Sequence, residues 1–265
     1  MSGPLEILLL GGGHAHLTAL EPLARAVAGR ASIALLAPSE KLLYSGMMPG
    51  WIAGQYRFEQ CAIPLRRWCE AAGVRWIEDR VVDIAFPDRR ALGASGRSYR
   101  YDLVSINVGS ENALGEVDAA VQDRVLGAKP FARFVDRWQA GGRFGTARRC
   151  LVVGGGAAGV ELALALRAAG SPEREVTLLG SGTRLLEGMA TGAARRARAA
   201  LAARRIRVRL GARYLGASAG GLALADGSAE TFDIAIVATG ARPPGWLGAC
   251  ALRDAVSVAA DGGLA

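Results

Sequence analysis

Two glycine-rich turns, each lying between a short apolar run and a helix-like stretch, constrain the fold of this chain more than any other feature. The first is Gly-Gly-Gly-His-Ala-His at 11–16, and the second occupies 154–159; their first glycines lie 143 positions apart (154 minus 11). In this setting glycines let backbone N–H groups approach a pyrophosphate at a helix N-terminus. One such turn is weak evidence. Two in one chain predict two dinucleotides, and a flavin with a nicotinamide is the natural pair.

The surrounding pattern predicts an α/β chain with two Rossmann-like halves, because apolar runs alternate with helical spacing in each. For the first half we expect strands at 5–10, 32–37, 74–77, 81–84 and 101–108, and helices at 17–28 and 64–72. For the second half we expect strands at 150–153, 176–179, 206–210 and 233–238, and helices at 159–169 and 192–204; a helix-like stretch at 131–139 lies in the segment that bridges the halves. Glycine and proline predict a loop at 44–50, and turn formers predict hairpins at 88–100 and around Asp226-Gly227.

At 265 residues the chain is long enough for one large domain or two ordinary ones. No apolar run approaches the roughly 20 residues needed to cross a bilayer. The N-terminus lacks the basic start and long apolar stretch of a secretory signal. We therefore expect a cytoplasmic protein, either soluble or peripheral to the inner face of the membrane.

The formal charge of +8 comes almost entirely from arginine, since Lys41 and Lys129 are the only lysines. The densest group lies within 195–209. Its simplest interpretation is the solvated face of a helix and the start of the next strand. An anionic membrane surface is the second interpretation. Nucleic acid comes third, because no aromatic residues interleave the arginines, and we expect no nucleic-acid partner.

The cysteines form no close dithiol pair; they are Cys61, Cys69, Cys150 and Cys250. Buried reduced thiols are the default for the last two. The first two are eight positions apart, a little over two helical turns, which is too far for a disulfide in an unbent helix. Both histidines of the chain lie inside the first glycine turn, so we predict no metal site.

The order of these motifs resembles the flavoproteins with two dinucleotide-binding domains, the pyridine nucleotide-disulfide oxidoreductase family. The subgroups most similar are type II NADH dehydrogenases, sulfide:quinone oxidoreductases and the flavoprotein module fused to some selenide, water dikinases. The runs at 11–16, 44–50 and 52–54 are most similar to the last subgroup. The resemblance implies FAD at the first turn and NAD(P)H at the second.

The resemblance also implies a domain order. Residues 1–145 would form the first part of an FAD-binding domain, 146–240 an inserted NAD(P)-binding domain, and 241–265 an incomplete return segment. The chain ends before the third FAD motif and the C-terminal interface domain of the family, so we expect a fragment or a minimal relative. A pocket without one wall should bind FAD more weakly.

The site residues follow from the resemblance, position by position. Those expected near FAD are Gly11, Gly13, His14, Ala15, His16, Ser39, Ser45, Gly46, Met47, Val81, Gly109 and Ser110. Those expected near NAD(P)H are Gly154, Gly156, Ala157, Gly159, Ser181, Arg184 and Gly240. Glu161 matches a glutamate near the junction of nicotinamide and flavin, or it is a helix N-terminal acid that interacts with the dipole. Lys129 matches a Lys-Pro that would place a positive charge near the flavin, or it is an exposed connector lysine.

Two departures from the family pattern affect these assignments. His16 replaces the third glycine, which normally permits close helix–strand packing, so it must pack or hydrogen-bond there. It is either a flavin contact or an ordinary histidine at a helix N-terminus. The ribose-binding acid expected after the second strand of each half is absent, with Ser39 and Gly180-Ser181 in its place. Because Arg184 is nearby in the sequence, NADPH is an alternative to NADH as the bound nicotinamide nucleotide.

The resulting functional hypothesis is an FAD-dependent NAD(P)H oxidoreductase that reduces a quinone-like or other small acceptor. A sulfide- or selenium-linked oxidoreductase is an alternative, although poised cysteine pairs are lacking. A non-catalytic dinucleotide-binding module is another. A homodimer is compatible with the family, but the region that usually forms its contacts is the missing one.

Overall fold

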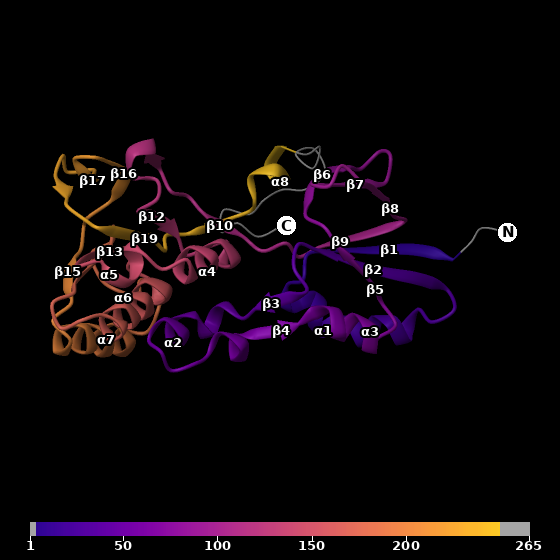
Figure 1. Cartoon of the computed structure of the whole chain (residues 1–265), viewed down its shortest axis with the longest axis horizontal. Helices are drawn as coiled ribbons and strands as arrows, with labels where there is room; N and C mark the ends of the chain where they lie inside the picture. The colour runs from indigo at the N-terminus through magenta and orange to yellow at the C-terminus, as the bar shows by residue number, and fades with distance from the viewer. Residues whose placement is uncertain (1–3, 250–265) are drawn as a thin grey trace. The chain divides into compact units, whose positions relative to one another are not determined.

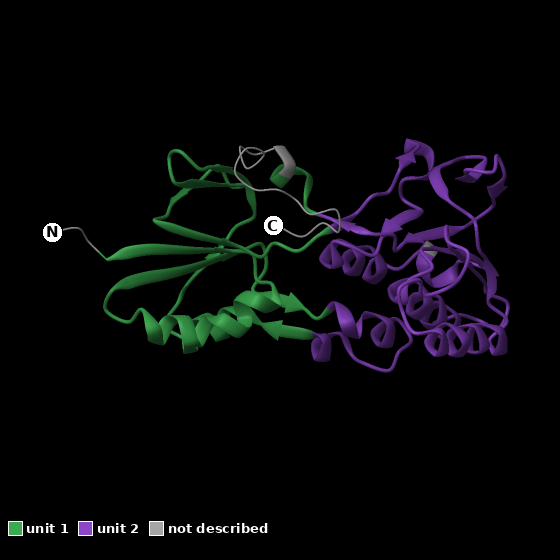
Figure 2. Cartoon of the chain, turned by 180° about the vertical axis from the view of Figure 1, so that it is seen from behind, with its two compact units in different colours: residues 1–44, 62–110, 243–265 green, residues 45–61, 111–242 purple. Residues whose placement is uncertain are grey.

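The computed structural model describes residues 4–249, which form two compact units (Figures 1 and 2). Unit 1 takes the described parts of 1–44, 62–110 and 243–265. Unit 2 takes 45–61 and 111–242. Within residues 4–249 no helix is both long and apolar enough to cross a bilayer.

Unit 1 is built on a four-stranded parallel sheet in the order β5-β2-β1-β9. These strands are β1 (Leu5–Leu10), β2 (Ala31–Ala37), β5 (Arg75–Glu78) and β9 (Leu103–Ile106). The remaining strands are the antiparallel pair β3 (Lys41–Leu43) and β4 (Ala62–Pro64), and the meander β6 (Val81–Ala85), β7 (Arg90–Gly93) and β8 (Ser98–Arg100). The helices are α1 (His14–Ala26), α3 (Leu65–Ala71) and α8 (Gly245–Ala249).

The parallel sheet of unit 1 is covered on both faces, which explains why its strands are apolar at nearly every position. Alternate side chains such as Ile7 and Leu9 pack with the α1 and α3 face, with Leu20 in the same cluster. The intervening Leu8 and Leu10 pack with residues of the meander, on the other side of the sheet (Figure 1). The two-residue period of a strand produces these two separate cores.

Unit 2 repeats this plan around a five-stranded parallel sheet in the order β12-β19-β13-β14-β15. The strands are β12 (Val125–Gly127), β13 (Arg149–Val153), β14 (Glu175–Leu179), β15 (Arg207–Arg209) and β19 (Ile234–Val237). A second sheet contains β11 (Glu116–Val117), β16 (Tyr214–Ser218), β17 (Gly221–Leu224) and β18 (Ala229–Glu230), and β10 (Glu111–Asn112) pairs with β20 (Ala241–Arg242).

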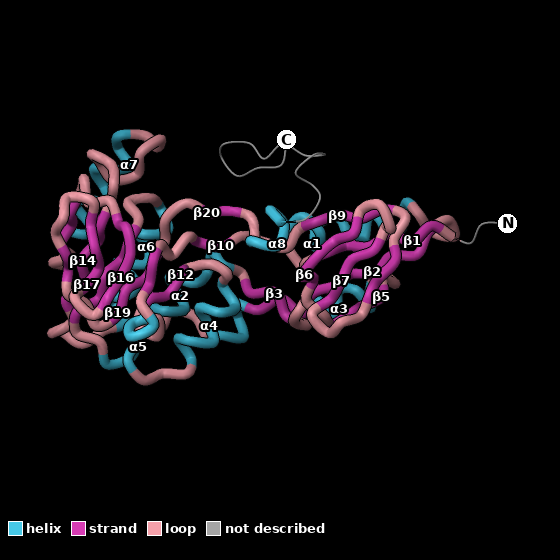
Figure 3. Tube along the Cα trace, turned by 90° about the horizontal axis from the view of Figure 1, so that it is seen from above, coloured by secondary structure: helices cyan, strands magenta, loops and turns pink. Residues whose placement is uncertain are grey.

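The helices of unit 2 cover one face of its parallel sheet, and the second sheet covers the other (Figure 1). Figure 3 shows the same strands and helices from above, in magenta and cyan. The helices are α2 (Met48–Ile52), α4 (Phe131–Gln139), α5 (Arg143–Thr146), α6 (Ala157–Ala169) and α7 (Thr191–Ala203). Short 3-10 turns are η1 (Ser45–Met47), η2 (Phe58–Cys61) and η3 (Ala119–Val121). The buried Arg174 guanidinium donates to four backbone carbonyls, of Phe144, Gly145, Ala147 and Leu166, and so ties α5 and α6 to β14.

Most strands and helices expected from the sequence are present, with ends displaced by at most three residues. The loop expected at 44–50 is wrong, because η1 and α2 form there. Pro49 occupies the first turn of α2, where a missing N–H costs nothing, and Met48 and Ile52 are buried. The strand expected at 101–108 is only four residues long, Leu103–Ile106.

The two units are bounded differently from the expected domains 1–145, 146–240 and 241–265. Residues 111–145 lie in unit 2, because β12 joins the edge of its parallel sheet beside β19. Residues 45–61 lie there too, where α2 shares a buried core with α6. Residues 250–265, which include Cys250 and most of the expected return segment, lie outside the described part of the chain.

Candidate dinucleotide-binding turns

The first glycine turn follows β1, which lies between β2 and β9 in the sheet. Gly11 has φ +88°, and a Cβ on it would lie 2.3 Å from the Asn107 carbonyl oxygen. A Cβ on Gly13 would lie 1.4 Å from Asn107 Oδ1. Both positions therefore require glycine, and the chain can pass close to Asn107 only because side chains are absent.

The second turn has matching geometry after β13, which lies between β14 and β19. Gly154 has φ +134°, and its Cβ would lie 2.5 Å from the Ala238 carbonyl oxygen. Gly159, in the first turn of α6, has so little room that a Cβ would lie 1.8 Å from the Gly154 oxygen. The expected role of the third glycine, close packing of helix on turn, holds here.

Both turns leave the start of a helix open. Gly13 and Gly156 are the N-cap residues of α1 and α6, both extended, and neither helix has a side-chain cap. His14, Ala15 and Ala157 follow as exposed first-turn residues. Uncapped N–H groups at the carboxyl end of the central strand of a parallel sheet form the usual binding place for a diphosphate.

His16 fills the place of a third glycine in the first turn. It is 4% exposed; its Nδ1 lies 2.7 Å from the Gly11 carbonyl oxygen, and its Nε2 lies 2.9 Å from Ser105 Oγ on β9. Burial lowers the pKa of His16, and the Gly11 contact opposes this in part. The sequence analysis expects His16 to pack or hydrogen-bond here, and the structure supplies its partners: His16 is a buried link between α1, the turn and β9.

Asn107 and Ser105 are residues that the sequence interpretation missed. Asn107 follows β9, donates its N–H to Leu10 O at 2.8 Å, and accepts from Gly13 N–H at 3.2 Å. The available signal was a polar residue at the carboxyl end of an apolar strand, which in a parallel sheet lies at the ligand-binding edge. The expected Gly109 and Ser110 come just after it, with Gly109 at φ +81°.

The ends of the second strands carry no acid, as the sequence indicates. After β2, Ser39 is exposed and its hydroxyl accepts from Lys41 N–H at 3.2 Å. After β14, Ser181 and Arg184 are exposed. Glu187 was missed: its Oε1 accepts from Thr183 N–H at 2.9 Å, so a carboxylate lies on the turn that follows β14.

Asp79 anchors the segment that leads to Val81. It follows β5, donates its N–H to Ala37 O at 3.1 Å, and is buried. Burial would raise its pKa, but hydrogen bonds from the Ser95 and Tyr99 hydroxyls and from the Arg80 and Ser95 amides outweigh this and lower the pKa to about 2. Val81 is buried at the start of β6, so its position is well defined.

Asn112 organises the carboxyl edge of the unit 2 sheet. Its Oδ1 accepts from Lys129 N–H at 2.7 Å, and its Nδ2 donates to the Thr239 carbonyl. It thereby joins the segments after β12 and β19, which carry the expected Lys129 and Gly240, both exposed. Glu161 is exposed on α6. Ser45, Gly46 and Met47 form η1 and belong to unit 2, and their contact with a flavin stays a prediction.

The described cysteines are buried and unpaired: Cys61, Cys69 and Cys150. Burial raises the pKa of each thiol, to about 11 for Cys69 and Cys150. Thiolates are therefore scarce near neutral pH. Within residues 4–249 no group of three or more His, Cys, Asp or Glu side chains is placed to hold a metal ion.

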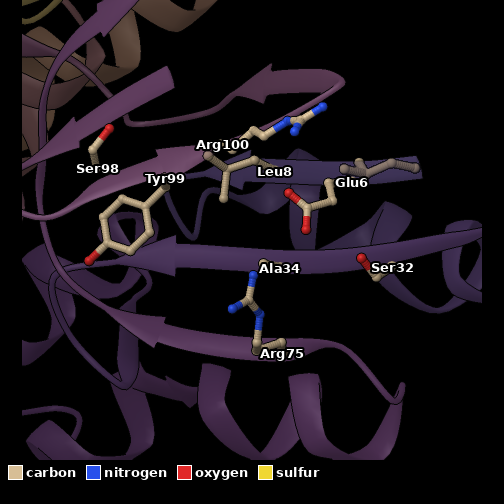
Figure 4. Close-up of a pocket in the computed structure, with 9 residues that line it drawn as sticks. Glu6, Leu8, Ser32, Ala34, Arg75, Ser98, Tyr99 and Arg100 are labelled. Carbon is tan, nitrogen blue, oxygen red and sulfur yellow. The ribbon is translucent and has the colours of Figure 1, made fainter. Parts of the chain in front are cut away.

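A pocket of about 220 Å³ lies in unit 1 between the sheet and β8 (Figure 4). Its lining includes Glu6, Ser32, Arg75, Ser98 and Arg100. Glu6 and Ser32 come from the beginnings of β1 and β2, at the opposite end of the sheet from the first turn. The pocket is therefore separate from the glycine turns.

These features define a class: a protein with two Rossmann-type units, each presenting a glycine turn and an open helix start at the carboxyl edge of its sheet. Residues 5–261 match the family model of the pyridine nucleotide-disulphide oxidoreductases, and the chain belongs to this family. A search of curated protein sequences found no significant match.

Solved structures share the fold at low sequence identity. A ferredoxin reductase for the CYP199A2 system from Rhodopseudomonas palustris is 22% identical with a TM-score of 0.77, covering 96% of this chain and 62% of the other. A water-forming NADH oxidase from Lactobacillus brevis, bound to NADH, is 20% identical with a TM-score of 0.78, covering 97% and 58%. NDH2 from Plasmodium falciparum, in complex with NADH, is 13% identical with a TM-score of 0.72, covering 91% and 56%. The chain thus spans about 60% of the length of these proteins.

Proposed function

We propose that this protein is an FAD-dependent oxidoreductase that passes electrons from NAD(P)H through the flavin to a small acceptor, such as a quinone-like molecule. The observation that supports it most is the repeated turn. In each unit the first glycine has a positive φ, and a Cβ there would lie within 2.5 Å of a carbonyl oxygen at the end of the neighbouring strand. Such a cradle fits a diphosphate, which needs the backbone close to it and N–H groups free to donate.

FAD, when bound, accepts a hydride from NAD(P)H and passes electrons on, and the residues of the chain bind and orient it. In unit 1 the turn 11–16 would hold the FAD diphosphate. Ser39 and Val81 would face the adenosine half, and Gly109 and Ser110 the ribityl side. Ser45, Gly46 and Met47 would lie along the ribityl chain or ring.

In unit 2 the turn 154–159 would hold the NAD(P)H diphosphate, with Gly240 beside it across the β19 edge. Ser181 and Arg184 would face the adenosine ribose. Because no acid follows β14 directly, a 2′-phosphate is not repelled there at close range, and Arg184 is placed to attract it. Glu187 opposes this with a carboxylate on the same turn. NADH and NADPH should therefore both be tested in the assay.

Lys129 and Glu161 are the candidate groups near the reacting rings. Asn112 binds the backbone of Lys129, which gives this exposed lysine a defined place on the sheet edge. We propose that it supplies positive charge to the reduced flavin. We propose that Glu161 helps to place the nicotinamide.

Sulfide or selenium chemistry is the alternative that the described cysteines favour least. Such chemistry needs accessible thiolates, whereas Cys61, Cys69 and Cys150 are buried with raised pKa values. A non-catalytic dinucleotide-binding module is the second candidate, because the two glycine turns with their uncapped helix starts account for nucleotide binding without any redox step.

The arginine face of α7 bears on localisation. Arg195, Arg196 and Arg198 are exposed there. A solvated surface accounts for this face, and we propose peripheral contact with anionic lipid as the alternative. Sedimentation with anionic vesicles, but not with neutral vesicles, would support that contact.

One measurement tests the proposed activity. Purified protein, reconstituted with FAD and freed of excess, should be yellow and should bleach anaerobically when NADH or NADPH is added. Colour should return when a soluble quinone is added. Protein that binds NAD(P)H but retains no FAD would instead support the module, and protein that binds neither would exclude both.

A further inference from the structure

The two glycine turns hold the carbonyl of their first glycine in different ways. In unit 2 the Gly154 carbonyl is packed against Gly159, in α6, at a distance that leaves no space for a Cβ. In unit 1 the corresponding Gly11 carbonyl accepts a hydrogen bond from the His16 imidazole. A contact of backbone on backbone is thus replaced by a side chain inserted between turn and helix.

The identity of the acceptor fixes the position of one His16 proton. A carbonyl oxygen can only accept, so Nδ1 carries hydrogen and donates it to Gly11 O at 2.7 Å. In the neutral ring Nε2 is then an acceptor, and the Ser105 hydroxyl donates to it at 2.9 Å. His16 is 4% exposed; its contact with Gly11 is buried and its contact with Ser105 is partly buried.

Fixing the Gly11 carbonyl also fixes the next N–H. The peptide between Gly11 and Gly12 is a planar unit, in which the Gly12 N–H points opposite to the Gly11 oxygen. Gly11 has no side chain and a positive φ, so little else in the residue itself restricts this plane. The hydrogen bond from His16 therefore orients an N–H of the turn, and Ser105 holds the imidazole in place from β9.

We propose that His16 is the positioning residue of the first turn: with Ser105 behind it, it orients the Gly12 N–H toward the diphosphate of the bound dinucleotide. This inference rests on the proposed function, which places FAD at this turn. It assigns to one histidine the task that Gly159 performs by close packing in unit 2. It also predicts that substitutions at His16 or Ser105 change nucleotide binding at the first turn and leave binding at the second turn unchanged.

The test is titration of the flavin-free full chain with FAD, followed by flavin fluorescence, in a set of single variants. His16→Ala removes one hydrogen bond to the turn and should weaken FAD binding about tenfold. His16→Asn places an amide N–H near the position of Nδ1 and should recover binding to within about threefold of the parent. Ser105→Ala keeps the donor to Gly11 and should weaken binding about threefold.

His16→Gly separates this proposal from a simple motif rule. It creates the regular pattern of three glycines, which would restore binding if the glycine alone mattered. Because glycine, like alanine, brings no donor to the Gly11 carbonyl, we expect His16→Gly to bind FAD no better than His16→Ala.

Two controls distinguish positioning from general loss of structure. Leu20→Ala removes a buried side chain of α1 without touching the turn, so it should lower thermal stability and leave the Kd for FAD unchanged. The Kd for NADH at the second turn should stay the same in every variant.

The outcomes separate the inference from the function on which it rests. If the parent chain binds FAD and His16→Ala binds it equally well, the inference is overturned and the proposed function stands. If His16→Gly restores binding, the inference is also overturned. If the parent chain binds no FAD at all, both fail together.

Discussion

At the scale of single residues, the buried Asp79 carboxylate shows how one side chain fixes a connection. It accepts two hydroxyl and two amide hydrogen bonds from a segment of the meander and from its own neighbour. A Cβ on Gly93 would lie 1.9 Å from Asp79 Oδ2, so the strand beside it must pass without a side chain. Asp79 therefore positions the start of β6, where Val81 is expected to meet the adenine.

Asp79→Asn should destabilise the protein at neutral pH by about 2 kcal/mol, because the folded state lowers the carboxyl pKa from its usual value near 4 to about 2. A lowered pKa gives stability that is present above the unfolded pKa and lost as the pH falls through the folded pKa. The difference in free energy of unfolding between parent and variant should therefore shrink from pH 5 toward pH 2. Urea unfolding across that range measures it.

The matched control is Asp83→Asn, on the exposed side of β6, whose carboxylate accepts one amide hydrogen bond, from Ile84. It should change stability by less than about 0.5 kcal/mol. An effect of Asp79→Asn that is the same at pH 2 and pH 7 would contradict the assignment of the charge.

At the scale of elements, the glycines of one turn differ sharply in what they tolerate. Gly154→Ala should destabilise unit 2 by about 2 kcal/mol or more, because its φ is +134° and the new Cβ would meet the Ala238 carbonyl. Gly156→Ala should change stability by less than about 1 kcal/mol, because its φ is −80° and no atom lies within 4 Å of the new Cβ. Thermal unfolding of the two variants compares them directly, and equal losses would contradict this geometry.

Elements predicted from periodicity are largely present, while the short segments beside them are not predictable in the same way. The helix expected at 131–139 is α4, Phe131–Gln139, because Phe131, Phe134 and Trp138 are three and four positions apart and pack on one core. By contrast, the glycine and proline residues within Tyr44–Gly50 predict a loop, yet α2 forms. Five residues are too few to be stable alone, so the packing of Met48 and Ile52 decides the outcome.

At the scale of the whole molecule, each unit has its own parallel sheet and its own turn, so the two nucleotides should protect different parts of the chain. We expect FAD to slow amide hydrogen exchange at 11–16 and 105–110, and NADH to slow it at 154–161 and 180–187. A ligand that binds the folded form opposes local opening where it binds. Mass spectrometry of peptides from the full chain, with each nucleotide alone, measures this. Protection of both regions by one nucleotide would contradict the assignment of one site to each unit.

The α/β class, the two glycine turns and most of the strands around them follow from the sequence alone, because they depend on local periodicity and on glycines such as Gly11 and Gly154, whose positive φ other residues rarely adopt. The residues that lie across each turn are known only from the folded chain: Asn107 and Ser105 lie opposite Gly13 and His16, and Asn112 lies between the Lys129 and Thr239 segments. Ser105 lies 89 positions from His16 and Thr239 lies 127 positions from Asn112, and strand order brings each pair together. The local sequence pattern does not predict such hydrogen-bonded pairs, because they form only after the parallel strands have aligned their carboxyl ends at one edge of the sheet.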